Sequence, residues 1–143
     1  MSGYLKIKVE DARPHDAREI ADRLVAFNRK MAGRPDPQPY VVTLRDERGA
    51  LRGGIEAILH WDVVFIDTFW VDEDLRERDL GSQLIAAAEA EAKRRGANIA
   101  YLDTFSWQAR PFYEKQGYEV FGELPYAEGK HRRYFMMKRL DTK

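Results

Sequence analysis

A chain of 143 residues with 44% apolar and 34% charged side chains has the composition of a globular domain with room for a hydrophobic core. Lysine and arginine together number 24, as do aspartate and glutamate, so the zero net charge provides no basic excess for nucleic-acid binding. The lack of cysteine excludes disulfide bonds, thiolate metal sites and a cysteine nucleophile. We expect residues 1–143 to form a single cytoplasmic domain without membrane contact, because no signal-peptide core and no apolar run of about 20 residues is present.

The first quarter of the chain predicts a strand and a helix. Apolar and polar residues alternate over residues 4–10, as in a half-buried strand. Residues 33–39 contain three prolines and form a surface loop, where a lid over a binding site could lie. Between them a helix runs from Pro14 to about Met31, and four apolar residues at helical spacing give it one buried face: Ile20, Leu24, Phe27 and Met31.

Three strands are expected next, at residues 40–45, 50–61 and 63–71. Residues 46–49 have the composition of a turn that joins the first two of them. Gly53 and Gly54 lie inside the second strand, which indicates a bulge or a close backbone contact. The third strand is a nearly unbroken apolar run, which is typical of a central strand that is buried on both faces.

The second half of the chain alternates between helices and strands. Residues 81–95 are rich in alanine and predict the clearest helix of the chain. A strand–helix–strand unit implies a parallel pair with a right-handed crossover, whereas the other strands are connected as hairpins, so the fold class is α/β (α+β) with a mixed sheet. The remaining elements are a strand at 98–104, a short helix N-capped by Ser106 and ending at Gln116, and strands at 118–124 and 131–140.

The turn between the central strand and the long helix is the first candidate site. The first amides of a helix are unpaired, and the helix dipole adds positive potential, so residues 76–82 can hold a phosphate or pyrophosphate. Arg76 and Arg78 add positive charge. An ordinary surface turn with salt bridges fits the same local sequence, and both interpretations stay open at this point.

The segment from Ser106 to Tyr118 is the second candidate site. Ala109, Phe112 and Tyr113 are spaced three and four residues apart and share one helix face. The Tyr113 hydroxyl can lie at the end of the sheet and act as a general acid. For an isolated Phe-Tyr pair, a purely structural role in the core is the favoured interpretation.

Together, the two segments resemble the GCN5-related N-acetyltransferase (GNAT) superfamily, which transfers an acetyl group from acetyl-coenzyme A to an amine. The family's phosphate motif, Arg/Gln-x-x-Gly-x-Gly/Ala, aligns with residues 76–81, and its motif Asn-x-x-Ala-x-x-Phe-Tyr-x-Lys-x-Gly-Phe aligns with residues 106–118. The resemblance covers residues 40–140 and extends more loosely to residues 4–31. It implies a mostly antiparallel sheet of about six to seven strands with a central parallel splayed pair, flanked by about four helices.

The resemblance also implies the roles of individual residues. The pantetheine arm would pair with the backbone of Phe69, Trp70 and Val71 like an added strand. Tyr113 matches the tyrosine that protonates the departing coenzyme A thiolate. Acetyl-coenzyme A is the implied co-substrate, and no metal is expected. The other implied cofactor contacts are Arg76, Glu77, Arg78, Asp79, Leu80, Gly81 and Ser82 around the pyrophosphate, together with Ser106, Ala109 and Phe112.

Two positions depart from the family pattern. Asp79 replaces the first motif glycine, and a carboxylate repels a pyrophosphate unless it points away. Aspartate adopts the left-handed backbone conformation more readily than most residues, so either the backbone shape is kept or the side chain caps the helix. Ser106 replaces asparagine, and its shorter side chain has less reach for a cofactor contact.

The group that accepts the amine proton is expected on the central strand. Period-two alternation places Phe65, Asp67, Phe69 and Val71 on one face, which makes Asp67 a candidate base or amine-orienting residue at the edge of the cofactor channel. The alternative is a buried structural carboxylate. Weaker candidates for the base are His60 and Glu56 on the preceding strand.

The expected function is transfer of the acetyl group to a primary amine by direct attack in a ternary complex, since no cysteine is available for a covalent intermediate. The acceptor is a small-molecule or peptide amine. Trp61, Trp70 and Trp107 line its pocket or serve in packing, and the hairpin residues Tyr126 and Tyr134 suggest a homodimer.

Two other classes of function compete with this one. A non-catalytic acyl-coenzyme A-binding or sensor module could use the same fold, but it would have no need of a proton donor at Tyr113. A nucleotide- or nucleic-acid-binding module is disfavoured because the chain has neither a P-loop Gly-x-x-x-x-Gly-Lys-Ser/Thr motif nor a basic excess.

Overall fold

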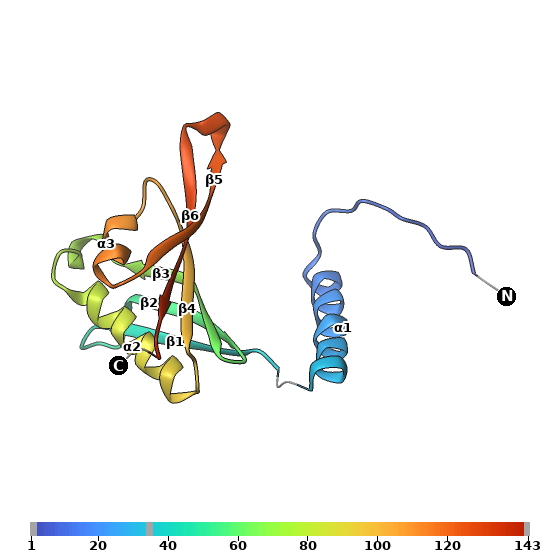
Figure 1. Cartoon of the computed structure of the whole chain (residues 1–143), viewed down its shortest axis with the longest axis horizontal. Coiled ribbons are helices and arrows are strands. Elements are labelled where there is room, and N and C mark those ends of the chain that lie inside the picture. The colour runs from blue at the N-terminus through green and yellow to red at the C-terminus, as the bar shows by residue number, and fades with distance from the viewer. Residues whose placement is uncertain (1–2, 34–35, 142–143) are drawn as a thin grey trace. The chain divides into compact units, whose positions relative to one another are not determined.

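The computed structural model describes residues 3–33 and 36–141, and the chain divides into two compact units, residues 1–36 and 37–143. Figure 1 draws both units, and the expected single domain stays a prediction. No helix among the described residues combines the length and apolar character needed to cross a bilayer. The cytoplasmic location also stays a prediction.

The first unit consists of an extended segment and the helix α1 (Pro14–Ala32), which ends at Gly33 in the left-handed conformation. The strand expected at residues 4–10 is wrong, because residues 3–13 pair with no strand in the described parts of the chain. The helix is confirmed, but none of its residues is buried, and Ile20, Leu24 and Phe27 are all more than half exposed. An extended segment offers this unit no core in which to bury an apolar stripe.

The second unit is built on a six-stranded sheet with the order β1-β2-β3-β4-β6-β5 (Figure 1). Only β3 and β4 pair in parallel; the other four pairs are antiparallel. The expected mixed sheet with a central parallel pair is therefore confirmed, with six strands. Their bounds are β1 Gln38–Arg45, β2 Leu51–His60, β3 Val63–Val71, β4 Ile99–Phe105, β5 Glu119–Tyr126 and β6 His131–Arg139.

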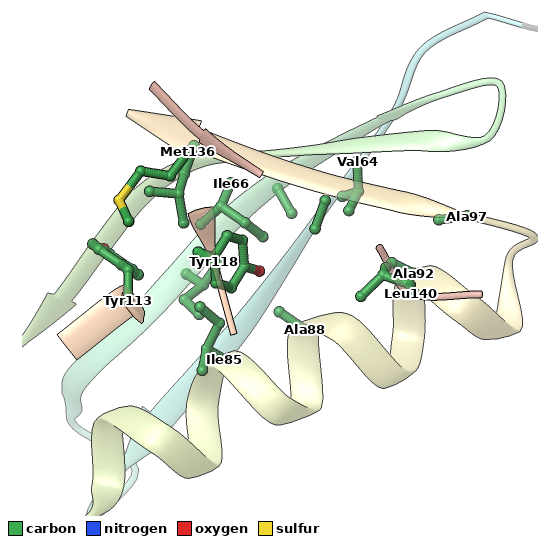
Figure 2. Packing of buried hydrophobic residues seen from close by; sticks show 14 of the residues in the cluster. Val64, Ile66, Ile85, Ala88, Ala92, Ala97, Tyr113, Tyr118, Met136 and Leu140 are labelled. Carbon is green, nitrogen blue, oxygen red and sulfur yellow. The ribbon is translucent and has the colours of Figure 1, made fainter. Parts of the chain in front are cut away.

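Two α-helices of this unit contribute to its core, α2 (Leu80–Arg94) and α3 (Arg110–Lys115). The right-handed crossover through α2 presents Ile85, Ala88 and Ala92 to the sheet (Figure 2). Small alanine side chains let the helix approach the strands closely. Two short 3-10 helices complete the unit, η1 (Glu73–Leu75) after β3 and η2 (Ala127–Gly129) between β5 and β6.

Gly53 and Gly54 in β2 allow an unusually close backbone approach. A Cβ atom at Gly54 would lie 2.5 Å from the carbonyl oxygen of Val42, and one at Gly53 would lie 2.7 Å from that of Trp70. The close contact expected at this glycine pair is confirmed. The two glycines thus bring β1 and β3 against either side of β2, and β3 is the strand that borders the candidate site.

Candidate functional site

The central parallel strands stop pairing partway along their length. We call the unpaired stretch, between residues 67–71 of β3 and residues 103–105 of β4, the slot. Strands β3 and β4 pair only from Val63 to Ile66 and from Ile99 to Leu102, although β3 continues to Val71 and β4 to Phe105. Over the same stretch β3 remains paired with β2 on its other side. The edge of β3 that faces the slot therefore carries backbone donors and acceptors that an extended ligand can satisfy.

A ring of free amides lies where β3 leads into α2. Among the described residues, none accepts a hydrogen bond from the backbone N–H groups of residues 77–82. Glu77 and Asp79 have positive φ angles of 64° and 63°, which bend the turn into a concave shape. Such a shape in front of a helix N-terminus binds anions. The backbone geometry is compatible with a pyrophosphate, and the site itself stays a prediction.

Asp79 stands at the N-cap position of α2 in the left-handed conformation, and its side chain makes no capping hydrogen bond. The prediction that it keeps the backbone shape of a glycine is confirmed, and the alternative of side-chain capping is wrong. A left-handed backbone turns the N–H groups toward the anion site, and glycine adopts it without the steric strain that a Cβ atom adds.

Replacing Asp79 by glycine should therefore keep or tighten the binding of acetyl-coenzyme A, by up to about tenfold in Kd, because strain and a nearby negative charge are both removed. Titration calorimetry on the Asp79→Gly variant measures this. Asp79→Ala is the matched control, since it removes the charge but keeps the Cβ atom. A Kd several-fold weaker in Asp79→Gly would show that the carboxylate contributes to binding.

Strand β3 and helices α2 and α3 meet at the site through one glycine and three aromatic residues. The Phe69 ring on β3 lies 5.8 Å from the Phe112 ring and 6.2 Å from the Tyr113 ring, measured between centroids. A Cβ atom at Gly81, in the first turn of α2, would lie 3.4 Å from the Phe112 ring. The structure thus brings together four of the residues expected from the two motifs, Phe69, Gly81, Phe112 and Tyr113.

Tyr113 is a largely buried phenol whose ring contacts Phe69 of β3. Its side chain is only 8% exposed, yet its hydroxyl makes no hydrogen bond to the described residues. Among the described residues, every fully buried side-chain oxygen has a hydrogen-bond partner. The Tyr113 hydroxyl has none there, so it is not fully buried and reaches solvent. Burial and, to a lesser extent, the charge of Asp103 raise the pKa of Tyr113 to about 12. The phenol therefore keeps its proton at neutral pH.

Gln116 is a contributor that the sequence analysis missed. Its Nε2 donates a hydrogen bond of 3.1 Å to Oγ of Ser82, which joins the C-cap of α3 to the first turn of α2. The bond holds the amide turn and the tyrosine helix at a fixed separation. The only sequence signal for it was the position of Gln116 three residues after Tyr113, on the same short helix.

Trp70 and Arg76 interact with each other at the edge of the slot. The Arg76 guanidinium lies 4.6 Å from the centroid of the Trp70 ring, and its Nε donates a hydrogen bond of 2.9 Å to the carbonyl oxygen of Val71. The Trp70 indole donates to Asp72 over 3.0 Å. Arg78 is exposed and forms no ion pair with the residues that the structure describes. Arg76 likewise forms no ion pair with a described residue, so both arginines have their charge available for a ligand.

Ser106 connects two strands and does not begin a helix. Its Oγ accepts a hydrogen bond of 3.1 Å from the backbone N–H of Arg132, and its own N–H donates to the Arg132 carbonyl over 2.8 Å. The N-cap of α3 is Ala109, whose carbonyl accepts the first helical bond, from the Tyr113 N–H at 3.1 Å. The expected N-cap is therefore wrong, whereas a cofactor contact of Ser106 stays a prediction.

A β-bulge changes which residues share a face with Asp67. Glu56 of β2 pairs with Thr68 and Ala57 pairs with Ile66, so Asp67 is an extra residue in β3. The bulge shifts the alternation of side chains, and the residues before and after it face opposite sides of the sheet. The shared face expected for Phe65, Asp67, Phe69 and Val71 is therefore wrong. Asp67 itself is exposed at the start of the slot, which excludes the buried structural role.

The remaining candidates are spread over the unit. His60 ends β2, and Trp61 lies in the turn before β3, at the end of that strand away from the slot. Tyr134 packs against the core, whereas Tyr126 is partly exposed, and the homodimer stays a prediction. The loop expected at residues 33–39 as a lid includes residues 34–35, which lie outside the described residues.

Comparisons with known proteins agree with this geometry. The model of the acetyltransferase (GNAT) family matches residues 5–118. Blasticidin-S acetyltransferase of Streptomyces morookaense is 35% identical over 112 residues, which are 78% of this chain and 82% of that protein. A crystal structure of an acetyltransferase from Agrobacterium tumefaciens, 26% identical, superposes with a TM-score of 0.87 over 95% of this chain and 99% of that chain. An aminoglycoside 6′-N-acetyltransferase solved with coenzyme A shares the fold, at 20% identity and a TM-score of 0.66 over 92% of this chain and 96% of that one.

Proposed function

Because the chain belongs to the acetyltransferase (GNAT) family, we propose that it transfers the acetyl group of acetyl-coenzyme A to a primary amine by direct attack in a ternary complex. The observation that carries the proposal is the convergence of the slot beside β3, the free amides of residues 77–82 and the Tyr113 hydroxyl. Each corresponds to one part of the reaction: an extended arm, a pyrophosphate and a leaving thiolate.

The geometry of the slot and of the turn after it supports a set of proposed cofactor contacts. The backbone of Phe69, Trp70 and Val71 pairs with the amides of the pantetheine arm. The pyrophosphate lies on the amides of residues 77–82, and Arg76 and Arg78 add positive charge. Gly81 leaves the turn free of a side chain at the point where it meets Phe112. Ser82 is held in place by Gln116.

In the proposed reaction the amine nitrogen bonds to the thioester carbonyl carbon, and the carbon–sulfur bond breaks. Tyr113 gives its proton to the departing thiolate, and water or the next proton donor restores the phenol. A phenol whose pKa is raised to about 12 holds its proton until the thiolate forms. The proton lost by the amine passes to Asp67 or to solvent around it, since Asp67 is exposed at the start of the slot, directly after the last paired residue of β3.

Asp67→Asn should lower kcat/KM for the amine by about tenfold and leave the Kd of acetyl-coenzyme A unchanged, because general-base assistance is lost while the slot is kept. The remaining activity should rise more steeply with pH, since only the unprotonated amine then reacts. Steady-state rates across pH 6–9 test this. Glu56→Gln is the matched control, because Glu56 pairs next to the bulge. A larger loss of kcat/KM in Glu56→Gln than in Asp67→Asn would assign the role of general base to Glu56.

We propose a small-molecule amine as the acceptor, since a 35% identical relative is a blasticidin-S acetyltransferase. The deciding experiment is a screen of amines with acetyl-coenzyme A that measures released thiol and the acetylated product. The library holds small antibiotics, simple alkyl and aryl amines, and peptides with a free N-terminus. Product from any primary amine supports an enzyme. Tight cofactor binding without product from any amine would favour the non-catalytic sensor.

A further inference from the structure

A cluster of stacked aromatic rings lies at the open end of the slot. We define the aromatic platform as Phe105, Trp107, Tyr126 and His131. The Trp107 and Phe105 rings are stacked, with centroids 4.6 Å apart and an angle of 13° between their planes. Tyr126 meets Phe105 edge-on at 5.1 Å, and His131 meets Trp107 at 4.8 Å. These contacts hold the rings in a defined arrangement, although Trp107 is 60% exposed.

The platform lies on the sheet face that the helices leave open. Along β4, Leu102 and Thr104 are buried in the core, so Asp103 and Phe105 between and after them face the opposite side. The helical side of the slot is filled by the rings around Tyr113. An acceptor therefore approaches the thioester from the open face, where the last residues of β4 border the slot.

Arg133 supports the aromatic platform, and its charge is neutralised by Asp103. Arg133 donates to Asp103 over 3.0 Å and to the Tyr126 hydroxyl over 3.1 Å, and its guanidinium lies 5.6 Å from the centroid of Phe105. The charges left available beside the bulge are therefore negative: Asp67 and Glu56 form no ion pair with any described residue. A positively charged ligand is the complementary partner of such a surface.

On these grounds we propose that the acceptor carries a flat aromatic or heteroaromatic ring close to its amine, and that this ring stacks on Trp107 of the aromatic platform. The inference rests on the proposed function and narrows its substrate class. Trp107 keeps most of its surface open, while Phe105 and His131 fix its orientation beside the end of β4. Its ring offers a stacking surface at little entropic cost.

Two amines of equal charge and similar size test the inference: benzylamine, which is flat, and cyclohexylmethylamine, which is saturated. Their binding to the protein saturated with coenzyme A is measured by calorimetry, and their turnover with acetyl-coenzyme A by released thiol. We expect the native protein to prefer benzylamine by about tenfold in both measurements. Trp107→Ala should abolish this preference, and Trp107→Phe should keep part of it. Trp61→Ala is the control, because Trp61 is an exposed tryptophan at the far end of β3.

Each outcome bears on one proposal. Turnover of both amines without a preference, or a preference that survives in Trp107→Ala, would overturn the ring-stacking inference and leave the acetyltransferase proposal standing. A ring preference in binding that depends on Trp107, without turnover of either amine, would support the platform and leave the proposed reaction to the wider screen of amines. A loss of preference in Trp61→Ala equal to that in Trp107→Ala would show a general effect on the fold and would also overturn the inference.

Discussion

Replacing Tyr113 by phenylalanine is expected to lower kcat by about 100-fold or more, with the Kd of acetyl-coenzyme A changed by no more than about twofold. The ring contacts with Phe69, Phe112 and Tyr118 do not involve the hydroxyl, so the variant keeps its packing. Only the proton donor is lost. The coenzyme A thiolate must then leave unprotonated or take its proton from water.

Tyr118→Phe is the matched control for this experiment. Its side chain is also buried, but its hydroxyl donates to Glu89 over 2.8 Å, and Lys138 donates to the same carboxylate over 2.8 Å. That control should lose stability and retain kcat. Normal turnover in Tyr113→Phe, or an equal loss in both variants, would mean that Tyr113 is not the acid.

The pH dependence gives a second readout for Tyr113. A pKa raised to about 12 means that the neutral, proton-donating form persists at all pH values below that point. The native rate should therefore show no alkaline decline assignable to this group up to about pH 10, two units below the raised pKa. A decline in rate between pH 8 and 9 that disappears in Tyr113→Phe would contradict the raised pKa of Tyr113.

Patterns of neighbouring residues predicted the strand β3, the helix α2 and the turn that joins them. The unbroken apolar run gave β3 with its ends unchanged at Val63 and Val71, and the alanine-rich segment gave α2 to within one residue at either end. The turn between them could be foreseen because an apolar strand, a charged turn and a strong helix follow one another directly. The left-handed backbone at Asp79 follows from the same motif, since glycine stands there in the family pattern.

Long-range pairing decided what the sequence analysis missed. The bulge at Asp67 exists because two residues of β3 face one position of β2, and no pattern within β3 reports this. Alternation at residues 4–10 predicted a strand, but alternation supplies no hydrogen-bond partner. Ser106 has the chemistry of an N-cap, yet its hydroxyl is taken by the backbone of Arg132, which is distant in sequence.

The sheet itself should be most sensitive at Gly54. A Cβ atom there would lie 2.5 Å from the carbonyl oxygen of Val42, and a backbone oxygen cannot rotate away as a side chain can. Gly54→Ala must therefore push β1 away from β2, and Tyr40 and Val42 of β1 pack against the core. We expect a loss of about 2–4 kcal/mol in the free energy of unfolding, which lowers Tm by roughly 6–12 °C.

Gly122→Ala is the matched control for Gly54→Ala, since Gly122 also lies in a strand, β5, but has no atom within 4 Å of a built Cβ. This control should change the free energy of unfolding by less than about 0.5 kcal/mol. Thermal and urea unfolding of both variants measure the difference. A Gly54→Ala variant as stable as the control would mean that β1 can shift freely. Because β2 also pairs with β3, the same comparison shows how firmly the slot is held: a rigid β1–β2–β3 layer predicts weaker acetyl-coenzyme A binding in Gly54→Ala and unchanged binding in Gly122→Ala.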